Sequence, residues 1–198
     1  AVPDDRLDAL ADIAQSANRI PARLSFVDIA GLVRGASKGE GLGNQFLANI
    51  REVDAIAHVL RCFEDSDITH VEGKIDPLAD ADTVETELML ADLESLEKRE
   101  DGLRKKAAAK EKEALAELEL VELALAELRE GRPARKAAIP ENRARDWKNL
   151  QLITSKPVIY VCNVEEDSAE SGNSLSAKVA EKAATENAEA VVISASTA

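Results

Sequence analysis

A long run of helix-forming residues, 82–129, dominates the sequence and contains no proline and almost no glycine. Apolar side chains recur along it at steps of three, four and seven, in two coiled-coil-like stripes: Met89, Leu93, Leu96 and Leu103, then Leu118, Val121, Leu125 and Leu128. A single helix of this length is unusual in a compact domain. We therefore expect two antiparallel helices, with a turn near residues 105–112, where the apolar stripe lapses. Gly131 and Pro133 end the second helix.

Short apolar runs with the composition of strands lie on both sides of this helical segment. Two precede it, at residues 24–29 and 55–60, and two follow it, at 157–162 and 190–194. Helical patterns over residues 44–52 and 175–187 alternate with these runs, which predicts an α/β fold with a parallel sheet. The predicted architecture is a parallel sheet flanked by helices, built from residues 1–80 and 150–198. An antiparallel helical hairpin over residues 81–149 is inserted into it.

The composition argues against several classes of function. The chain carries 25 Lys and Arg against 38 Asp and Glu, a net charge of −13, so it lacks the general cationic surface that coats nucleic acid. No apolar run approaches the roughly 20 residues of a membrane span. Cys62 and Cys162 lie inside apolar runs, as buried thiols of a reducing compartment do. We expect a cytoplasmic protein with no membrane contact and no DNA specificity.

The first apolar run ends in Asp28 and Gly31, spaced as Asp-x-x-Gly. A carboxylate at the carboxyl end of a strand can hold Mg²⁺, usually through water, and a glycine lets a backbone N–H approach a terminal phosphate. A glycine-rich loop follows, and such a loop can order around a γ-phosphate and relax once it leaves. Its glycines are Gly31, Gly35, Gly39, Gly41 and Gly43. By themselves these patterns also fit a strand leaving its sheet through a turn, followed by a flexible surface loop.

A third pattern, Asn163-Val164-Glu165-Glu166, follows the apolar run at 157–162. An amide and a carboxylate at this spacing can bracket a purine, because the amide meets the ring edge while the acid accepts hydrogen bonds from its N–H groups. The last apolar run ends at Ser194-Ala195. All three patterns therefore fall at the carboxyl ends of predicted strands. A solvated acidic turn is the alternative interpretation of residues 163–166.

Residues 28–47, which begin Asp28-Ile29-Ala30-Gly31-Leu32, resemble the Obg-related P-loop GTPases, and specifically the Obg-like ATPase (YchF) family. Arg61-Cys62-Phe63-Glu64 and the helical insertion also fit that family. The resemblance implies a P-loop GTPase-like partial G domain over residues 1–80 and 150–198, with residues 81–149 as the family's helical arm. Asp28 and Gly31 would then serve Mg²⁺ and the γ-phosphate of the nucleotide. The switch loop would include Leu32, Gly35, Gly39, Gly41 and Gly43.

The same resemblance implies an ATPase that prefers ATP to GTP. Asn163, Val164 and Glu166 would read the base in the Asn-x-x-Glu form, where GTP-specific relatives carry Asn-Lys-x-Asp, and Ser194 and Ala195 would form the last nucleotide-binding motif. Leu32 would replace the glutamine that orients the attacking water in Ras-like proteins, so no catalytic residue is assigned. Members of the family bind ribosomes. The expected partner is therefore the ribosome or its large subunit, with an rRNA contact through the arm.

The sequence departs from the family pattern at its two ends. It contains no Gly-x-x-x-x-Gly-Lys-Ser/Thr phosphate-binding loop (Walker A), and it stops before the family's TGS domain. We therefore expect a fragment that is inactive alone, since that loop's N–H groups and lysine supply most of the nucleotide affinity. The alternative function is a non-catalytic interaction scaffold built on the helical arm.

Overall fold

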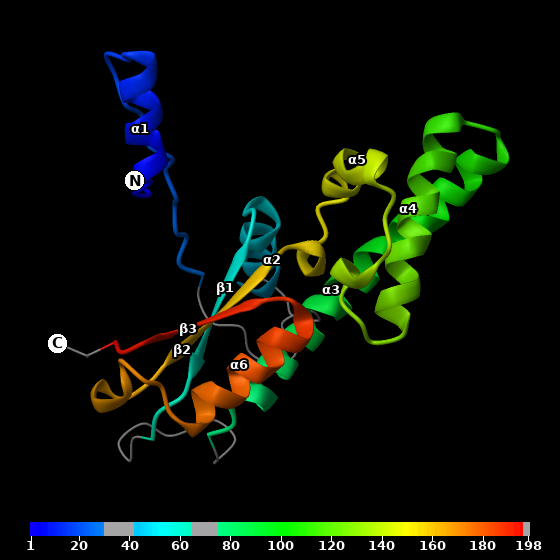
Figure 1. The fold of residues 1–198 in the computed structure, drawn as a ribbon. Coiled ribbons are helices and arrows are strands. Elements are labelled where there is room, and N and C mark those ends of the chain that lie inside the picture. Colours follow the sequence, from blue (N-terminus) through cyan, green and yellow to red (C-terminus); the bar gives the residue numbers. More distant parts are fainter. Residues whose placement is uncertain (30–41, 65–74, 196–198) are drawn as a thin grey trace. The chain divides into compact units, whose positions relative to one another are not determined.

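The computed structural model describes residues 1–29, 42–64 and 75–195, and the chain divides into two compact units, Ala1–Ala30 and Gly31–Ala198 (Figure 1). The first unit holds helix α1 (Asp5–Ala14). The Asp4 side chain caps this helix by accepting from the Arg6 N–H, and Gln15 ends it in the left-handed conformation, at φ 49°. Arg19 folds back onto the helix and pairs with Asp8 at 2.8 Å.

The strand predicted over residues 24–29 is wrong, because the structure shows no regular element there. Phe26 is 81% exposed, and Leu24 and Val27 are also exposed. An apolar run forms a strand only where a neighbouring strand satisfies its N–H and C=O groups. The strands that the structure describes all belong to the second unit.

The other three predicted strands are present, each within one residue of its expected bounds. They are β1 (Ile56–Arg61), β2 (Val158–Asn163) and β3 (Glu189–Ile193), which form a parallel sheet in the order β1-β2-β3. The register pairs Arg61 with Asn163 and Asn163 with Ile193, so the three strands end side by side. The loops that leave these ends therefore start from one edge of the sheet.

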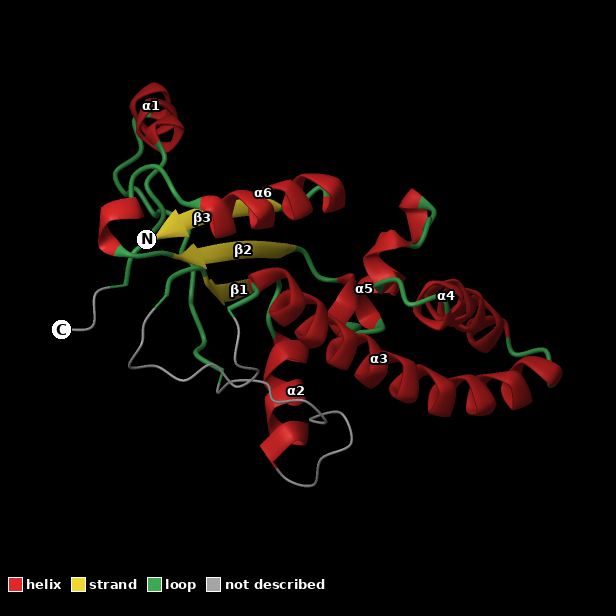
Figure 2. Ribbon diagram, turned by 90° about the horizontal axis from the view of Figure 1, so that it is seen from below, coloured by secondary structure: helices red, strands yellow, loops and turns green. Residues whose placement is uncertain are grey.

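Helices α6 (Ser174–Glu186) and the start of α3 (Pro77–Ala108) cover one face of this sheet (Figures 1 and 2). They enclose a core of eight buried residues: Leu60, Cys62, Ala81, Tyr160, Cys162, Val164, Val179 and Ala183. Side chains on a strand alternate between faces, and Val59, Val191 and Ile193, on the opposite face, are exposed. Helix α2 (Leu42–Glu52) precedes β1 and buries Leu47 and Ile50.

Helices α3 and α4 (Lys112–Arg129) pack against each other and are joined by residues 109–111, inside the range where the sequence predicts a turn. Three 3₁₀ turns and helix α5 (Ala144–Asn149) lead back to the sheet: η2 (Ala134–Lys136), η3 (Glu141–Arg143) and η4 (Ile153–Ser155). The apolar stripes meet in a second core, which Trp147, Leu150 and Leu152 complete. These three lie outside the helical repeat, so its spacing could not reveal them.

The Asp92 carboxylate joins α3 to the segment that enters β2. It is fully buried and accepts hydrogen bonds from the Ile153 N–H at 3.0 Å and from the Thr154 N–H and hydroxyl at 2.8 Å each. The Thr154 hydroxyl oxygen in turn accepts from the Ala134 N–H at 3.1 Å. Burial raises the pKa of Asp92, although these bonds and nearby Arg51 act to lower it.

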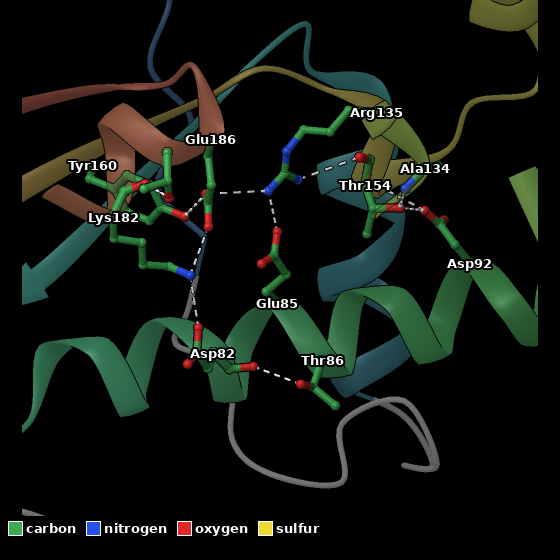
Figure 3. A network of polar contacts seen from close by, with 11 residues as sticks. Asp82, Glu85, Thr86, Asp92, Ala134, Arg135, Thr154, Tyr160, Lys182 and Glu186 are labelled. Atoms are coloured by element: carbon green, nitrogen blue, oxygen red, sulfur yellow. Dashed lines mark hydrogen bonds and ion pairs between the residues drawn. The ribbon is translucent and has the colours of Figure 1, made fainter. Parts of the chain in front are cut away.

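A second polar cluster connects α3, η2, α6 and β2 (Figure 3). Arg135 pairs with Glu85 and lies 3.7 Å from the Glu186 carboxylate, which also accepts from Lys182 at 2.7 Å and from the Tyr160 hydroxyl at 2.8 Å. Lys182 reaches Asp82 at 2.9 Å. Burial opposes the charge of Glu186, but the hydrogen bonds from Lys182 and Tyr160 outweigh it and hold the pKa of Glu186 below its ordinary value.

Asp92→Ala leaves the buried N–H groups of Ile153 and Thr154 without an acceptor. We expect the free energy of unfolding to fall by about 3–5 kcal/mol, the cost of two unsatisfied buried donors and a lost charged acceptor. Urea unfolding measures this change. Asp101→Ala, at an exposed position of the same helix, is the control and should change stability little. A loss below about 1 kcal/mol in Asp92→Ala would show that this contact does not secure the fold.

Glu186→Gln removes the charge that Lys182 and Arg135 face. At pH 7 we expect a loss of about 2 kcal/mol in the free energy of unfolding, as for hydrogen bonds to a charged group. Because the pKa of Glu186 is depressed, its contribution is present above the ordinary value of 4.5 and is lost as pH falls through the folded-state pKa. The difference between wild type and variant should therefore close in acid. Glu181→Gln, at an exposed position of the same helix, is the control and should change stability little at either pH.

Candidate functional site

Hydrogen bonds tie the carboxyl ends of β1, β2 and β3 together. The Asn163 carbonyl oxygen accepts from the Cys62 N–H at 2.8 Å, and the Asn163 side-chain Oδ1 accepts from the Ala195 N–H at 2.9 Å. The Val164 N–H donates to the Ile193 carbonyl at 2.9 Å. The structure therefore brings Asn163, Val164 and Ala195 to one edge of the sheet. Crevices outside such strand ends are where open parallel sheets bind ligands.

The members of the Asn163–Glu166 motif differ in exposure. Val164 is 2% exposed, and its side chain packs in the core beneath α6. Its side chain and N–H are thus both engaged inside the protein. Glu166 lies at the surface as the first residue of the 3₁₀ turn η5 (Glu166–Ser168). Ser194 is half-buried and Ala195 is exposed.

Two residues that were not assigned from the sequence, Glu165 and Asn173, hold this loop. The Glu165 carboxylate accepts from the Ser168 hydroxyl at 2.7 Å and from Asn173 Nδ2 at 3.0 and 3.2 Å. These bonds hold the pKa of Glu165 below its usual value, the Ser168 bond most strongly. Asn173 Nδ2 also donates to the Cys62 carbonyl at 2.6 Å. The signal in the sequence is an asparagine three residues before Ser176, which is a helix N-cap pattern.

Cys62 and Cys162 lie next to this edge, and both are buried free thiols. Burial, with a smaller contribution from the neighbouring Cys162, raises the pKa of Cys62 to about 12. Burial also raises the pKa of Cys162. A thiol with so little thiolate is a poor nucleophile, so neither cysteine is a candidate for covalent catalysis.

The predicted phosphate and metal residues lie elsewhere in the chain. Asp28 is an exposed residue of the first compact unit. Five of the predicted loop positions fall outside the described residues: Gly31, Leu32, Gly35, Gly39 and Gly41. Gly43 lies in the first turn of α2. Among the residues that the structure describes, no three His, Cys, Asp or Glu side chains gather as metal ligands.

Within the same described ranges, no helix is long and apolar enough to cross a membrane.

Comparisons with known proteins relate the chain to a family. Residues 11–91 match the family model described as a 50S ribosome-binding GTPase. The chain is 48% identical over 196 residues to the ribosome-binding ATPase YchF of Bacillus subtilis (strain 168), covering 98% of this chain and 54% of the relative. It is 50% identical over 194 residues to the Haemophilus influenzae protein of the same name, covering 98% of this chain and 53% of that one. The chain therefore spans about half the length of these relatives.

A solved structure agrees with the sequence relatives. The Schizosaccharomyces pombe YchF GTPase superposes with a TM-score of 0.77 at 36% identity, covering 98% of this chain and 54% of that one. This match confirms the predicted fold class, a P-loop GTPase-like parallel sheet flanked by helices.

The buried thiols give a direct test of the site's surroundings. Iodoacetamide at pH 8 should label neither Cys62 nor Cys162 in the folded chain, because both are buried and their raised pKa values leave almost no thiolate. Both should be labelled after unfolding in urea, which mass spectrometry can count and which serves as the positive control. Rapid labelling of either cysteine in the folded chain would mean that the β1–β2 edge is open to solvent.

Proposed function

The chain belongs to the YchF family, and we propose on that basis that the whole protein is a nucleotide-hydrolysing switch of the ribosome that prefers ATP to GTP. The observation that supports this proposal best is the alignment of the strand ends. It puts the Asn163–Glu166 loop beside Ser194 and Ala195 at the edge where a base would bind. A ribosomal role also implies that the protein works in the cytoplasm.

Base recognition starts from the orientation of the Asn163 amide. Its Oδ1 accepts from the Ala195 N–H, so Nδ2 points the other way and would donate to a ring nitrogen of the purine. The exposed Glu166 carboxylate accepts hydrogen bonds only, which suits the exocyclic amino group of adenine. Because the Val164 side chain is buried, its contact with the base would come from the backbone. Ser194 and Ala195 would close the other side of the base.

The phosphates would be handled by the segment from Asp28 onward. Mg²⁺ keeps several of its waters and is usually bound by one or two carboxylates together with the phosphates of the nucleotide, so the exposed Asp28 carboxylate is chemically suited to contribute through water. When bound, Mg²⁺ neutralises charge on the transferred phosphate. Gly31 would bring its N–H to the γ-phosphate, and the loop through Gly35, Gly39, Gly41 and Gly43 would respond to phosphate loss. Leu32 cannot orient water, which makes slow hydrolysis the expected behaviour.

The ribosome, or its large subunit, is the partner that we propose, and residues 81–149 form the arm that reaches it. Four lysines gather where α3 meets α4, and all are exposed: Lys105, Lys106, Lys110 and Lys112. Cations at one end of an otherwise acidic protein suit contact with rRNA phosphates.

A non-catalytic scaffold is the second candidate function, and the arm's own core favours it. Leu120, Val121, Ala124 and Leu125 are buried within the arm, away from the sheet core. An arm with its own core can present a surface to a partner without any nucleotide turnover.

Nucleotide binding separates the two functions. Binding of ATP and of GTP with Mg²⁺ should be measured for this chain and for a version extended at its N-terminus through the family's phosphate-binding loop. We expect the extended version to bind ATP more tightly than GTP. Glu166→Asp should shift the ratio of the two dissociation constants toward GTP by about tenfold, or about 1.4 kcal/mol.

Glu170→Asp, at a nearby exposed position, is the matched control and should leave that ratio unchanged. If the extended version binds neither nucleotide, the hydrolase proposal fails and the scaffold function takes its place.

A further inference from the structure

We propose that Asn173 is a positioning residue for base recognition, which it performs by bracing the Asn163–Glu166 loop through Glu165. The inference rests on the proposed function of that loop. Asn173 follows the loop in sequence but stands at the start of α6, where its amide meets two other segments. Its Nδ2 donates to the Glu165 carboxylate at 3.0 and 3.2 Å and to the Cys62 carbonyl, just after β1, at 2.6 Å.

The oxygen and the nitrogen of the Asn173 side-chain amide have different partners. Its Oδ1 accepts from the N–H groups of Leu175 and Ser176, each at 3.0 Å, and so caps α6. Ser176 completes the capping box, because its hydroxyl oxygen accepts from the Asn173 N–H at 2.8 Å. A cap needs only this oxygen. The Nδ2 bonds to Glu165 and to the Cys62 carbonyl therefore serve the loop and the end of β1 and not the helix.

The backbone conformation of the preceding residue, Gly172, lets Asn173 reach the loop. Gly172 has φ +72°, a conformation that favours glycine, and a Cβ placed there would lie 2.6 Å from the Ser176 hydroxyl oxygen. The turn that carries Asn173 to the loop is therefore available to glycine and strained for other residues.

Helix α6 gives the brace a fixed support. At its far end Glu186 accepts from Tyr160 of β2, and Lys182 reaches Asp82 of α3. In between, Val179 and Ala183 are buried against the sheet. Asn173 thus connects the loop to a helix that is held along its length, whereas the other side-chain partner of the exposed Glu165 carboxylate, Ser168, belongs to the loop itself.

Bracing matters because a loop that is ordered in advance loses less conformational entropy when it binds a ligand. Asn163 and Glu166 flank Glu165, so fixing Glu165 limits the positions that both base-reading side chains can take. The phosphates would bind elsewhere, from Asp28 onward. Loosening the brace should weaken binding of the base and leave phosphate binding unchanged.

The test uses the protein at its natural full length and three variants. Asn173→Ser keeps an oxygen for the helix cap and loses the Nδ2 bonds to Glu165 and to the Cys62 carbonyl. Glu165→Ala removes the brace from the other side. Ser176→Ala disrupts the capping box and leaves the brace in place, so it is the matched control. The probes are ATP and inorganic tripolyphosphate, each with Mg²⁺, because tripolyphosphate has no base.

We expect Asn173→Ser and Glu165→Ala each to weaken ATP binding by about tenfold, with little further loss in the double variant, because both remove the Asn173–Glu165 contact. Tripolyphosphate binding should stay within about twofold, and Ser176→Ala should change neither probe. Unchanged ATP binding in both single variants would overturn the proposal. So would an equal loss for both probes, which would indicate a general structural defect.

Amide hydrogen exchange separates failure of this proposal from failure of the proposed function. The N–H groups of Val164, Ser168 and Ala169 are hydrogen-bonded in the loop. If the wild-type protein binds neither probe, the proposed function fails. The exchange rates then show whether Asn173 orders the loop. Faster exchange at these amides in Asn173→Ser than in Ser176→Ala would support it, and equal rates would overturn it.

Discussion

The buried Asp92 carboxylate fixes the point at which the chain returns to the sheet, and the order of the sheet depends on that return. Parallel strands need a crossover connection, and here the crossover from β1 to β2 contains both arm helices. Asp92 on α3 holds the N–H groups of Ile153 and Thr154, a few residues before β2 begins. A long insertion can therefore leave the sheet without loosening the strand that follows it. The ion pair between Arg135 and Glu186 makes a second connection of the returning chain, between η2 and α6.

The start of β2 is thereby tied to the arm, and its end carries the candidate site. β2 is hydrogen-bonded on both sides, so its register sets where Asn163 meets Arg61 and Ile193. The side chain and backbone of Asn163 then join all three strand ends. A loop that reads adenine at this edge, as we propose, would need few dedicated contacts, because the parallel sheet brings its parts together. The structure links the arm and the Asn163–Glu166 loop through one strand and one helix, β2 and α6.

Sequence patterns predicted the strands and helices that depend mainly on residues close together in the chain. β1, β2 and β3 are short apolar runs that end in polar motifs, and each was found within one residue of its expected bounds. The run at residues 24–29 has the same composition, but composition does not show whether a partner strand is present, and these residues form no strand in the part of the chain that the structure describes. Asp92 contacts a residue 61 positions away, and one of the contacts of Asn173, with the Cys62 carbonyl, spans 111 positions. No spacing rule relates residues so far apart. The placement of Asp28 and of the glycine-rich loop against the base loop stays a prediction.

The central claim is that the carboxyl edge of β1–β3 binds an adenine base. A crystal structure of the full-length protein with a non-hydrolysable ATP analogue and Mg²⁺ tests it most directly. We expect the adenine ring between the Asn163–Glu166 loop and Ser194–Ala195, with Asn163 Nδ2 and the Glu166 carboxylate facing the ring. Density for the base away from these residues, or an analogue bound with its base in solvent, would contradict the claim.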